Sequence, residues 1–167
     1  VYVNAFYNRA ICYKELGRFD EAIADMDMVF TLDSSNVDAL IDKASYFSLN
    51  NQRTEAKQVL IKINQLFPTN AEAFYQLGVL QYLDKEYQNA INSYSEAIII
   101  NPQYTYAFND RASSYRALEK YALAVKDYKQ AISIDPQSFI YNNLGSVLKK
   151  TGDIDAALVA YSNAISK

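Results

Sequence analysis

The chain has 167 residues, of which 50% are apolar and 21% are charged, with only four glycines and three prolines. This length suffices for one core-forming domain, and the composition argues against disorder and against a loop-rich β fold. The net charge of −3 does not supply the dense basic surface of a nucleic-acid-binding protein. No apolar run approaches the length of a membrane-spanning helix, so we expect no membrane span.

The absence of histidine limits the chemistry that the chain can perform. Serine and cysteine nucleophiles usually take their base from histidine, and most zinc sites use imidazole. There is no glycine-rich phosphate loop and no residue cluster with metal-ligand spacing. The single cysteine, Cys12, cannot form an internal disulfide. We therefore expect no enzymatic activity, no cofactor and no metal site.

Residues of similar size recur along the chain in steps of 34 or 33. The three prolines, Pro68, Pro102 and Pro136, follow this step. Small residues follow it in two columns, which are Ala10, Ala44, Gly78, Ala112, Gly145 and Ala22, Ala56, Ala90, Ala124, Ala157. The period divides the chain into five repeats, which are residues 3–36, 37–70, 71–104, 105–137 and 138–167.

Each repeat is predicted to contain two helices, because its apolar residues are spaced by three and four rather than by two. In the first repeat, Gly17 is predicted to end the first helix and Asp20 to cap the second. Gly152 and Asp155 are assigned the same roles in the fifth repeat.

Proline marks the end of the second, third and fourth repeats, and Ser34 stands at the matching place of the first. Each proline follows a second helix, which cannot continue through it. Asn36 and Asn70 are predicted to cap the helices that follow. The small columns are expected where helices pack closely, because a larger side chain there would push the helices apart.

These columns resemble the tetratricopeptide repeat family, whose 34-residue helix-turn-helix unit carries a Leu-Gly or similar pair, alanines and a final proline. The matching stretches are AFYQLGVLQYLDKEYQNAINSYSEAIIINP and YNNLGSVLKKTGDIDAALVAYSNAI. The resemblance covers essentially the whole chain. It implies an all-α fold, a right-handed α-solenoid of five tandem repeats, in a single domain over residues 1–167. Because the chain begins at Val1 rather than methionine, we expect it to be part of a longer protein.

The chain departs from the family pattern where leucine is expected before the small residue. Arg9 and Arg111 occupy this place in two repeats, and Lys43 occupies it in another. In the two repeats with arginine, aspartate stands at the matching place of the second helix, as Asp25 and Asp127. We infer that these residues form ion pairs between the two helices. The alternative is that the charges align by chance and are solvated.

In a solenoid of this kind, the first helices of successive repeats form an inner concave face. Amides, tyrosines and carboxylates are predicted to line it, and these groups suit the binding of an extended peptide. The candidate ligand-binding residues are Tyr7, Asn8, Asp42, Glu72, Tyr75, Gln76, Tyr82, Tyr106, Asn109, Asp110, Asn142 and Asn143. The alternative is that they serve only to solvate an outward helix face.

The charges on this face favour a protein or peptide partner with a basic centre. Aspartates and a glutamate make its middle acidic, and Lys149 and Lys150 make its far end basic. Some family members bind the acidic C-terminal tail of chaperones through lysines, an arginine and asparagines. The matching places here hold Tyr7, Ile11, Asp42, Glu72 and Gln76. The lack of a cation among them disfavours a chaperone tail.

Three functions are compatible with this pattern. The first is a noncatalytic scaffold that binds a segment or helix of another protein in the groove. The second is self-association into a homo-oligomer through the terminal repeats, where Tyr2, Phe6, Leu158 and Tyr161 lack a polar cap. The third is a targeting domain of an enzyme whose catalytic part lies outside this chain. The fold does not identify the partner or the compartment.

Overall fold

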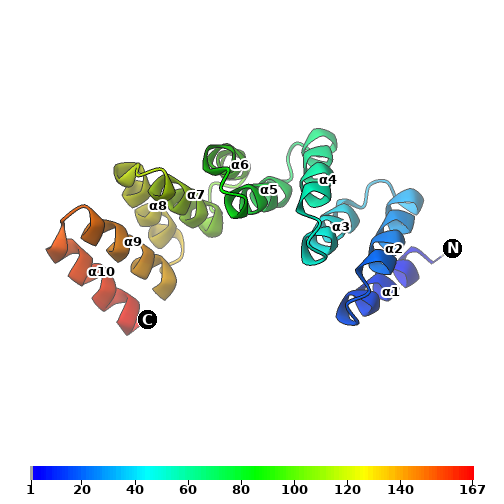
Figure 1. The fold of residues 1–167 in the computed structure, drawn as a ribbon, viewed down its shortest axis with the longest axis horizontal. Coiled ribbons are helices and arrows are strands. Elements are labelled where there is room, and N and C mark those ends of the chain that lie inside the picture. Colours follow the sequence, from blue (N-terminus) through cyan, green and yellow to red (C-terminus); the bar gives the residue numbers. More distant parts are fainter. Residues whose placement is uncertain (1) are drawn as a thin grey trace. The chain divides into compact units, whose positions relative to one another are not determined.

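The computed structural model describes residues 2–167, which form ten α-helices and no β-strand (Figure 1). The helices are α1 Val3–Glu15, α2 Phe19–Leu32, α3 Val37–Leu49, α4 Arg53–Leu66, α5 Ala71–Leu83, α6 Tyr87–Ile100, α7 Thr105–Ala117, α8 Tyr121–Ile134, α9 Ser138–Lys150 and α10 Ile154–Ser166. Among these residues, no helix has both the length and the apolar character needed to span a membrane.

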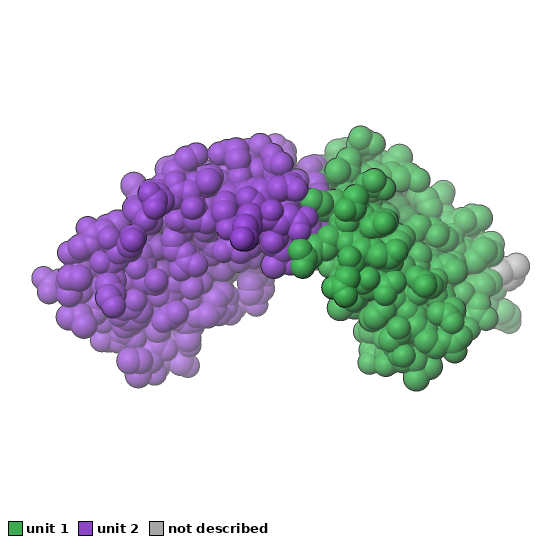
Figure 2. Space-filling model, in the orientation of Figure 1, with its two compact units in different colours: residues 1–73 green, residues 74–167 purple. Residues whose placement is uncertain are grey.

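The chain divides into two compact units (Figure 2). Unit 1 is Val1–Ala73 and unit 2 is Phe74–Lys167. In unit 1, α1 packs on α2, α2 on α3, and α3 on α4. In unit 2, α6 packs on α7, α7 on α8, α8 on α9, and α9 on α10, and the first helices α7 and α9 also touch. That the whole chain is a single domain stays a prediction.

The small residues of both columns lie where helices meet. All five residues of the first column and all five of the second are buried. A Cβ added to Gly78 would lie 2.6 Å from the Tyr94 ring, and one added to Gly145 would lie 2.8 Å from the Tyr161 ring. The lack of a side chain therefore makes room for a tyrosine on the second helix of the same pair.

The helix ends confirm part of the predicted capping and correct the rest. The Oδ1 atoms of Asn36 and Asn70 accept hydrogen bonds from the backbone N–H groups of Ala39 and Ala73, at 3.1 and 2.9 Å, as predicted. Gly17 follows α1 with φ +71° and Gly152 follows α9 with φ +87°, which is the left-handed conformation that suits glycine after a helix.

The predicted caps Asp20 and Asp155 are wrong, because both residues lie inside the first turn of their helices. The N–H of Arg18 bonds to the carbonyl of Tyr13 at 2.8 Å and closes the turn directly after Gly17, so α2 begins at Phe19. In the fifth pair the cap is Asp153, which accepts a bond from the N–H of Ala156 at 3.2 Å.

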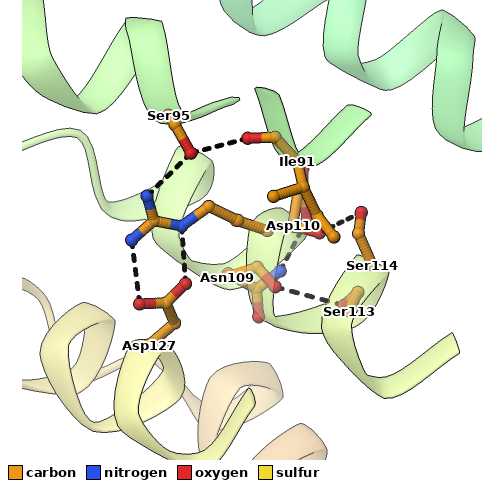
Figure 3. Close-up of polar contacts among 8 residues, drawn as sticks. Ile91, Ser95, Asn109, Asp110, Ser113, Ser114 and Asp127 are labelled. Atoms are coloured by element: carbon orange, nitrogen blue, oxygen red, sulfur yellow. Dashed lines mark hydrogen bonds and ion pairs between the residues drawn. The ribbon is translucent and has the colours of Figure 1, made fainter. Parts of the chain in front are cut away.

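Both predicted ion pairs are present. Arg9 donates from Nε and Nη2 to the two Asp25 oxygens, each at 2.7 Å. Arg111 donates in the same way to Asp127, at 2.7 and 2.9 Å (Figure 3). Such two-pronged contacts fix the angle between two helices more firmly than a single hydrogen bond does.

Lys43, which lacks an aspartate at the matching place of α4, pairs instead with a residue of the preceding helix. Its Nζ atom lies 2.5 Å from Asp27 Oδ1 on α2. The residue that precedes the small column therefore joins helices in each of these three repeats.

Candidate peptide-binding face

In unit 1, the predicted face is stabilised by a hydrogen bond between the first helices of successive repeats. The Tyr7 hydroxyl on α1 donates to Asp42 Oδ2 on α3. The pKa of Tyr7 is raised above its ordinary value, mainly by burial and secondly by the hydrogen bond to Asp42. Burial and the charges of Asp42 and Glu15 also raise the pKa of Tyr46 to about 12. Both tyrosines are therefore neutral at physiological pH. Asn8, one residue after Tyr7, is exposed.

In unit 2, the predicted residues form a larger hydrogen-bonded cluster around Asp110 on α7. Its Oδ2 accepts from the Tyr75 hydroxyl on α5 at 2.9 Å. Its Oδ1 accepts from Asn109 Nδ2 at 2.7 Å (Figure 3). Asn109 Oδ1 in turn accepts from Asn143 Nδ2 on α9 at 3.0 Å. Burial raises the pKa of Asp110, and the bonds from Tyr75 and Asn109 act in the opposite direction. Four predicted residues on three helices are thus connected.

The two Tyr-Asp bonds follow one rule of spacing. Tyr7 and Asp42 are 35 residues apart, as are Tyr75 and Asp110. Asn109 and Asn143 are 34 apart, in the part of the chain where the repeat is one residue shorter. Each bond joins one place in a first helix to the following place one repeat later. All six residues were predicted from the sequence, but the bonds between them were not.

The bonds change what these residues can offer to a partner. Asn109 is only 5% exposed, so its amide supports Asp110 and Asn143 rather than facing outward. Tyr75 is also packed between rings, with centroids 5.8 Å from Tyr94 and 4.8 Å from Tyr104. We interpret Tyr75 and Asn109 as residues that position the Asp110 carboxylate.

A small pocket lies beside this carboxylate, and we call it the tyrosine pocket. Its volume is about 130 Å³. The residues that line it come from α5, α6 and α7, and they are Val79, Tyr82, Leu83, Tyr94, Asp110 and Ser113. The Tyr82 ring also contacts Tyr87, with centroids 5.4 Å apart. Tyr82 was predicted as a site residue, whereas Tyr94 was not.

Other predicted residues lie outside the tyrosine pocket. Tyr106 on α7 is 46% exposed and stacks on Phe139 of α9, with ring centroids 6.2 Å apart. Asn142 lies beside Phe139 in a hollow of about 600 Å³ at the α9–α10 pair. Glu72 and Gln76 on α5 are partly buried.

A second hollow in unit 2 is basic, and we call it the basic hollow. Its volume is about 570 Å³, and it is lined by Arg116, Tyr121, Ser146, Lys149 and Lys150. The two lysines were predicted to make one end of the face basic, but their place in a site with Arg116 was not predicted.

The described residues 2–167 contain no group of three or more Cys, Asp or Glu side chains that could hold a metal ion. Cys12 is exposed and has no disulfide partner. The geometry around Asp110 consists of a carboxylate, hydroxyls and amides that bind to each other.

Family comparisons agree with the period and with the helix pairs. Models described as "Tetratricopeptide repeat" match residues 3–36, 71–104 and 140–166. A model described as "TPR repeat" matches residues 112–152. The chain belongs to the tetratricopeptide repeat family. Its fold is the all-α helical-repeat solenoid of that family.

Relatives with a similar sequence are longer proteins. The chain is 33% identical over 130 residues to small glutamine-rich tetratricopeptide repeat-containing protein 2 of Saccharomyces cerevisiae, covering 75% of this chain and 38% of the relative. It is 33% identical over 128 residues to UDP-N-acetylglucosamine–peptide N-acetylglucosaminyltransferase of Giardia intestinalis, covering 75% of this chain and 8% of the relative. It is 29% identical to Hsp70-Hsp90 organizing protein 3 of Arabidopsis thaliana, covering 69% and 21%. The chain therefore spans well under half the length of these relatives.

Solved structures of tetratricopeptide repeat proteins share the arrangement of the helices. A crystal structure of MamA superimposes with a TM-score of 0.85 at 27% identity, over 94% of this chain and 92% of that one. A thermophilic TPR protein of Thermus thermophilus gives a TM-score of 0.73 at 19% identity, over 99% and 91%, which indicates a shared fold. Among the relatives with a similar sequence, Hsp70-Hsp90 organizing protein 3 is named for organizing other proteins, and another relative is named as a transferase.

Proposed function

We propose that this tetratricopeptide repeat chain is a noncatalytic scaffold that binds a segment of another protein along α5, α7 and α9 of unit 2. The observation that carries the proposal is the tyrosine pocket, in which a positioned carboxylate lies among aromatic rings. The segment places one basic side chain in this pocket. The remainder of the segment lies over the outward polar and aromatic side chains of α7 and α9.

The size of the tyrosine pocket favours a single side chain. Its volume of about 130 Å³ is well below the roughly 300–1,000 Å³ of pockets that hold cofactors and drug-sized ligands. Hollows of this size on a helical face are suited to a side chain that anchors a longer segment. The extended surface around the pocket supplies the remaining contacts.

The chemistry of the tyrosine pocket favours a lysine or arginine of the partner. Asp110 supplies a negative charge, and the faces of Tyr82 and Tyr94 attract cations. Tyr75 and Asn109 hold the carboxylate in one orientation before binding, which lowers the entropic cost of recognition. A bound cation also compensates for the burial that raises the pKa of Asp110.

The experiment is site-specific photo-cross-linking in cells or lysate, with p-benzoylphenylalanine in place of one residue at a time. The test positions are Tyr82 in the pocket and Tyr106 on α7. The control position is Leu123 on α8, which at 44% exposed closely matches the 46% of Tyr106. We expect the same partner peptide to be cross-linked at both test positions, with a lysine or arginine next to the site of attachment at Tyr82, and not at Leu123.

Two results of this experiment would contradict the proposal. One is a partner that cross-links as well at Leu123 as at Tyr106. The other is a set of unrelated peptides at the two test positions, which would mean that no single segment follows this face. Tyr106 and Leu123 are exposed, so the larger photo-reactive side chain is not expected to disturb the fold at these two positions.

A second candidate function is self-association through α10. Its apolar residues Leu158, Val159 and Ile165 are 60%, 63% and 87% exposed, and large exposed apolar patches often mark protein–protein contacts. The same cross-linking experiment with the photo-reactive residue at Ile165 tests this candidate. A cross-link between two copies of the chain favours it, and a chain that cross-links only to other proteins rejects it.

A further inference from the structure

The basic hollow gathers three cationic side chains that lack a counter-ion among the described residues. Arg116 comes from α7, and Lys149 and Lys150 come from α9. Across residues 2–167, none of the three takes part in an ion pair or in a side-chain hydrogen bond. No carboxylate is among the five residues that line the hollow. Three like charges held together without compensation indicate a site whose counter-charges come from elsewhere.

A purely structural explanation accounts for only part of this arrangement. All three residues lie in the last turn of their helices, where a cation interacts favourably with the helix dipole. One cation on each helix would satisfy that role. It does not require that cations of two different helices face one hollow of about 570 Å³ together with the hydroxyls of Tyr121 and Ser146.

We propose that the basic hollow binds side-chain carboxylates of an acidic stretch in the partner segment. This inference rests on the proposed function, because it assigns a second anchor to the same segment. Ser113 of the tyrosine pocket and Arg116 of the basic hollow are three residues apart on α7, which is about 4.5 Å along the helix axis. The partner therefore carries a basic residue followed within a few residues by aspartates or glutamates.

The charges of the chain select this partner over other anions. The net charge is −3, and the neighbouring tyrosine pocket presents Asp110. A nucleic acid or an anionic membrane would meet this negative charge over its whole contact area, whereas a short acidic stretch meets only the hollow. The places that match the chaperone-tail site of other family members lie elsewhere in the chain and do not include Arg116, Lys149 or Lys150.

The test measures binding of synthetic fluorescein-labelled peptides by fluorescence anisotropy. The probe carries one lysine followed by Glu-Glu-Asp in a glycine-serine context, with both ends blocked. Its control peptide carries Gln-Gln-Asn in place of the acidic residues. We expect the acidic probe to bind at least about tenfold more tightly than its control, and to lose this advantage as the salt concentration rises.

The variant of the basic hollow is Lys149→Gln with Lys150→Gln, and the matched control is Lys126→Gln with Lys129→Gln on α8. Both pairs remove two charges from exposed positions, so they change the net charge equally. We expect the variant of the basic hollow to weaken binding of the acidic probe by about tenfold. The control variant should bind this probe within about twofold of the parent affinity. The melting temperatures are expected to stay close to that of the parent, because exposed lysines contribute little to stability.

Three outcomes would overturn the inference. They are equal binding of the acidic and control peptides, equal loss in the two double variants, and tighter binding of a peptide with phosphoserine in place of the glutamates. The cross-linking experiment at Tyr82 and Tyr106 does not use this peptide or these lysines. A failure of the basic hollow is therefore distinguishable from a failure of the proposed function.

Discussion

The Arg9–Asp25 pair of unit 1 and the Arg111–Asp127 pair of unit 2 have the same local geometry in different surroundings. In both pairs, the guanidinium donates twice to an aspartate that is 6% exposed at its side chain. In both, it also lies over two aromatic rings, at 5.4 and 5.7 Å for Arg9 and at 5.5 and 6.0 Å for Arg111. One local sequence pattern has therefore produced one local structure twice.

The surroundings of the two arginines differ because of what precedes each helix pair. Arg111 also donates from Nη1 to Ser95 of α6 at 3.0 Å, and its side chain is only 17% exposed (Figure 3). Among the described residues, no helix precedes α1, and the Arg9 side chain is 56% exposed. The ion pair forms within one repeat in both units, and Ser95 of the preceding repeat also contacts Arg111.

Removing the aspartate should show the largest difference in stability between the two ion pairs. Asp127→Ala leaves a largely buried guanidinium without its counter-ion and should lower the free energy of unfolding by about 3 kcal/mol. Asp25→Ala leaves an arginine that water can reach and should cost clearly less than Asp127→Ala. Urea denaturation of the two variants measures both costs.

The double variant Arg111→Leu with Asp127→Leu is the control for this prediction. It removes both charges, so it should be more stable than Asp127→Ala alone. Equal costs for Asp25→Ala and Asp127→Ala would show that burial by the preceding helix pair does not strengthen the dependence on the counter-ion.

The two Gly-Tyr contacts of unit 2 extend the comparison with a smaller expected effect. Gly78→Ala places a methyl group against the ring of Tyr94, which is 1% exposed. It should cost about 1–2 kcal/mol. Gly145→Ala meets Tyr161, which is partly exposed in the last helix, so the ring can shift. The better helix propensity of alanine should make this variant nearly neutral.

Thermal unfolding of the two glycine variants decides between these outcomes. A melting temperature that falls clearly for Gly78→Ala and stays near the parent value for Gly145→Ala agrees with the account. Equal decreases would mean that the end of unit 2 is as rigid as its interior.

Much of the fold could be predicted from the sequence because the repeat period determines which residues occupy equivalent positions in successive helix pairs. The caps Asn36 and Asn70 and both arginine pairs follow from position within a repeat. The predicted caps Asp20 and Asp155 were wrong because the turn closes directly after the left-handed Gly17 and Gly152. The second helix therefore begins earlier than predicted. Such an error of one or two residues is local and does not disturb the pairing of helices.

The site could be predicted only in part, because its chemistry depends on how successive repeats are offset. Counting along each first helix placed Tyr75 of α5 and Asn109 and Asp110 of α7 on the predicted face. Only the stacking of α5, α7 and α9 shows that a tyrosine meets the aspartate one repeat and one residue later. The offset also determines that Tyr82 and Asp110 share a pocket and that Arg116 joins the two lysines.

Chemical-shift mapping is the most direct test of the central claim that a partner segment binds along α5, α7 and α9. The measurement compares NMR spectra of ¹⁵N-labelled protein of residues 1–167 with and without a synthetic peptide that matches the cross-linked segment. The account predicts that the largest changes occur at Val79, Tyr82, Asp110 and Ser113 of the tyrosine pocket, followed by Ser146 and Lys149 of the basic hollow. Largest changes on α6 and α8, with the tyrosine pocket unaffected, would contradict it.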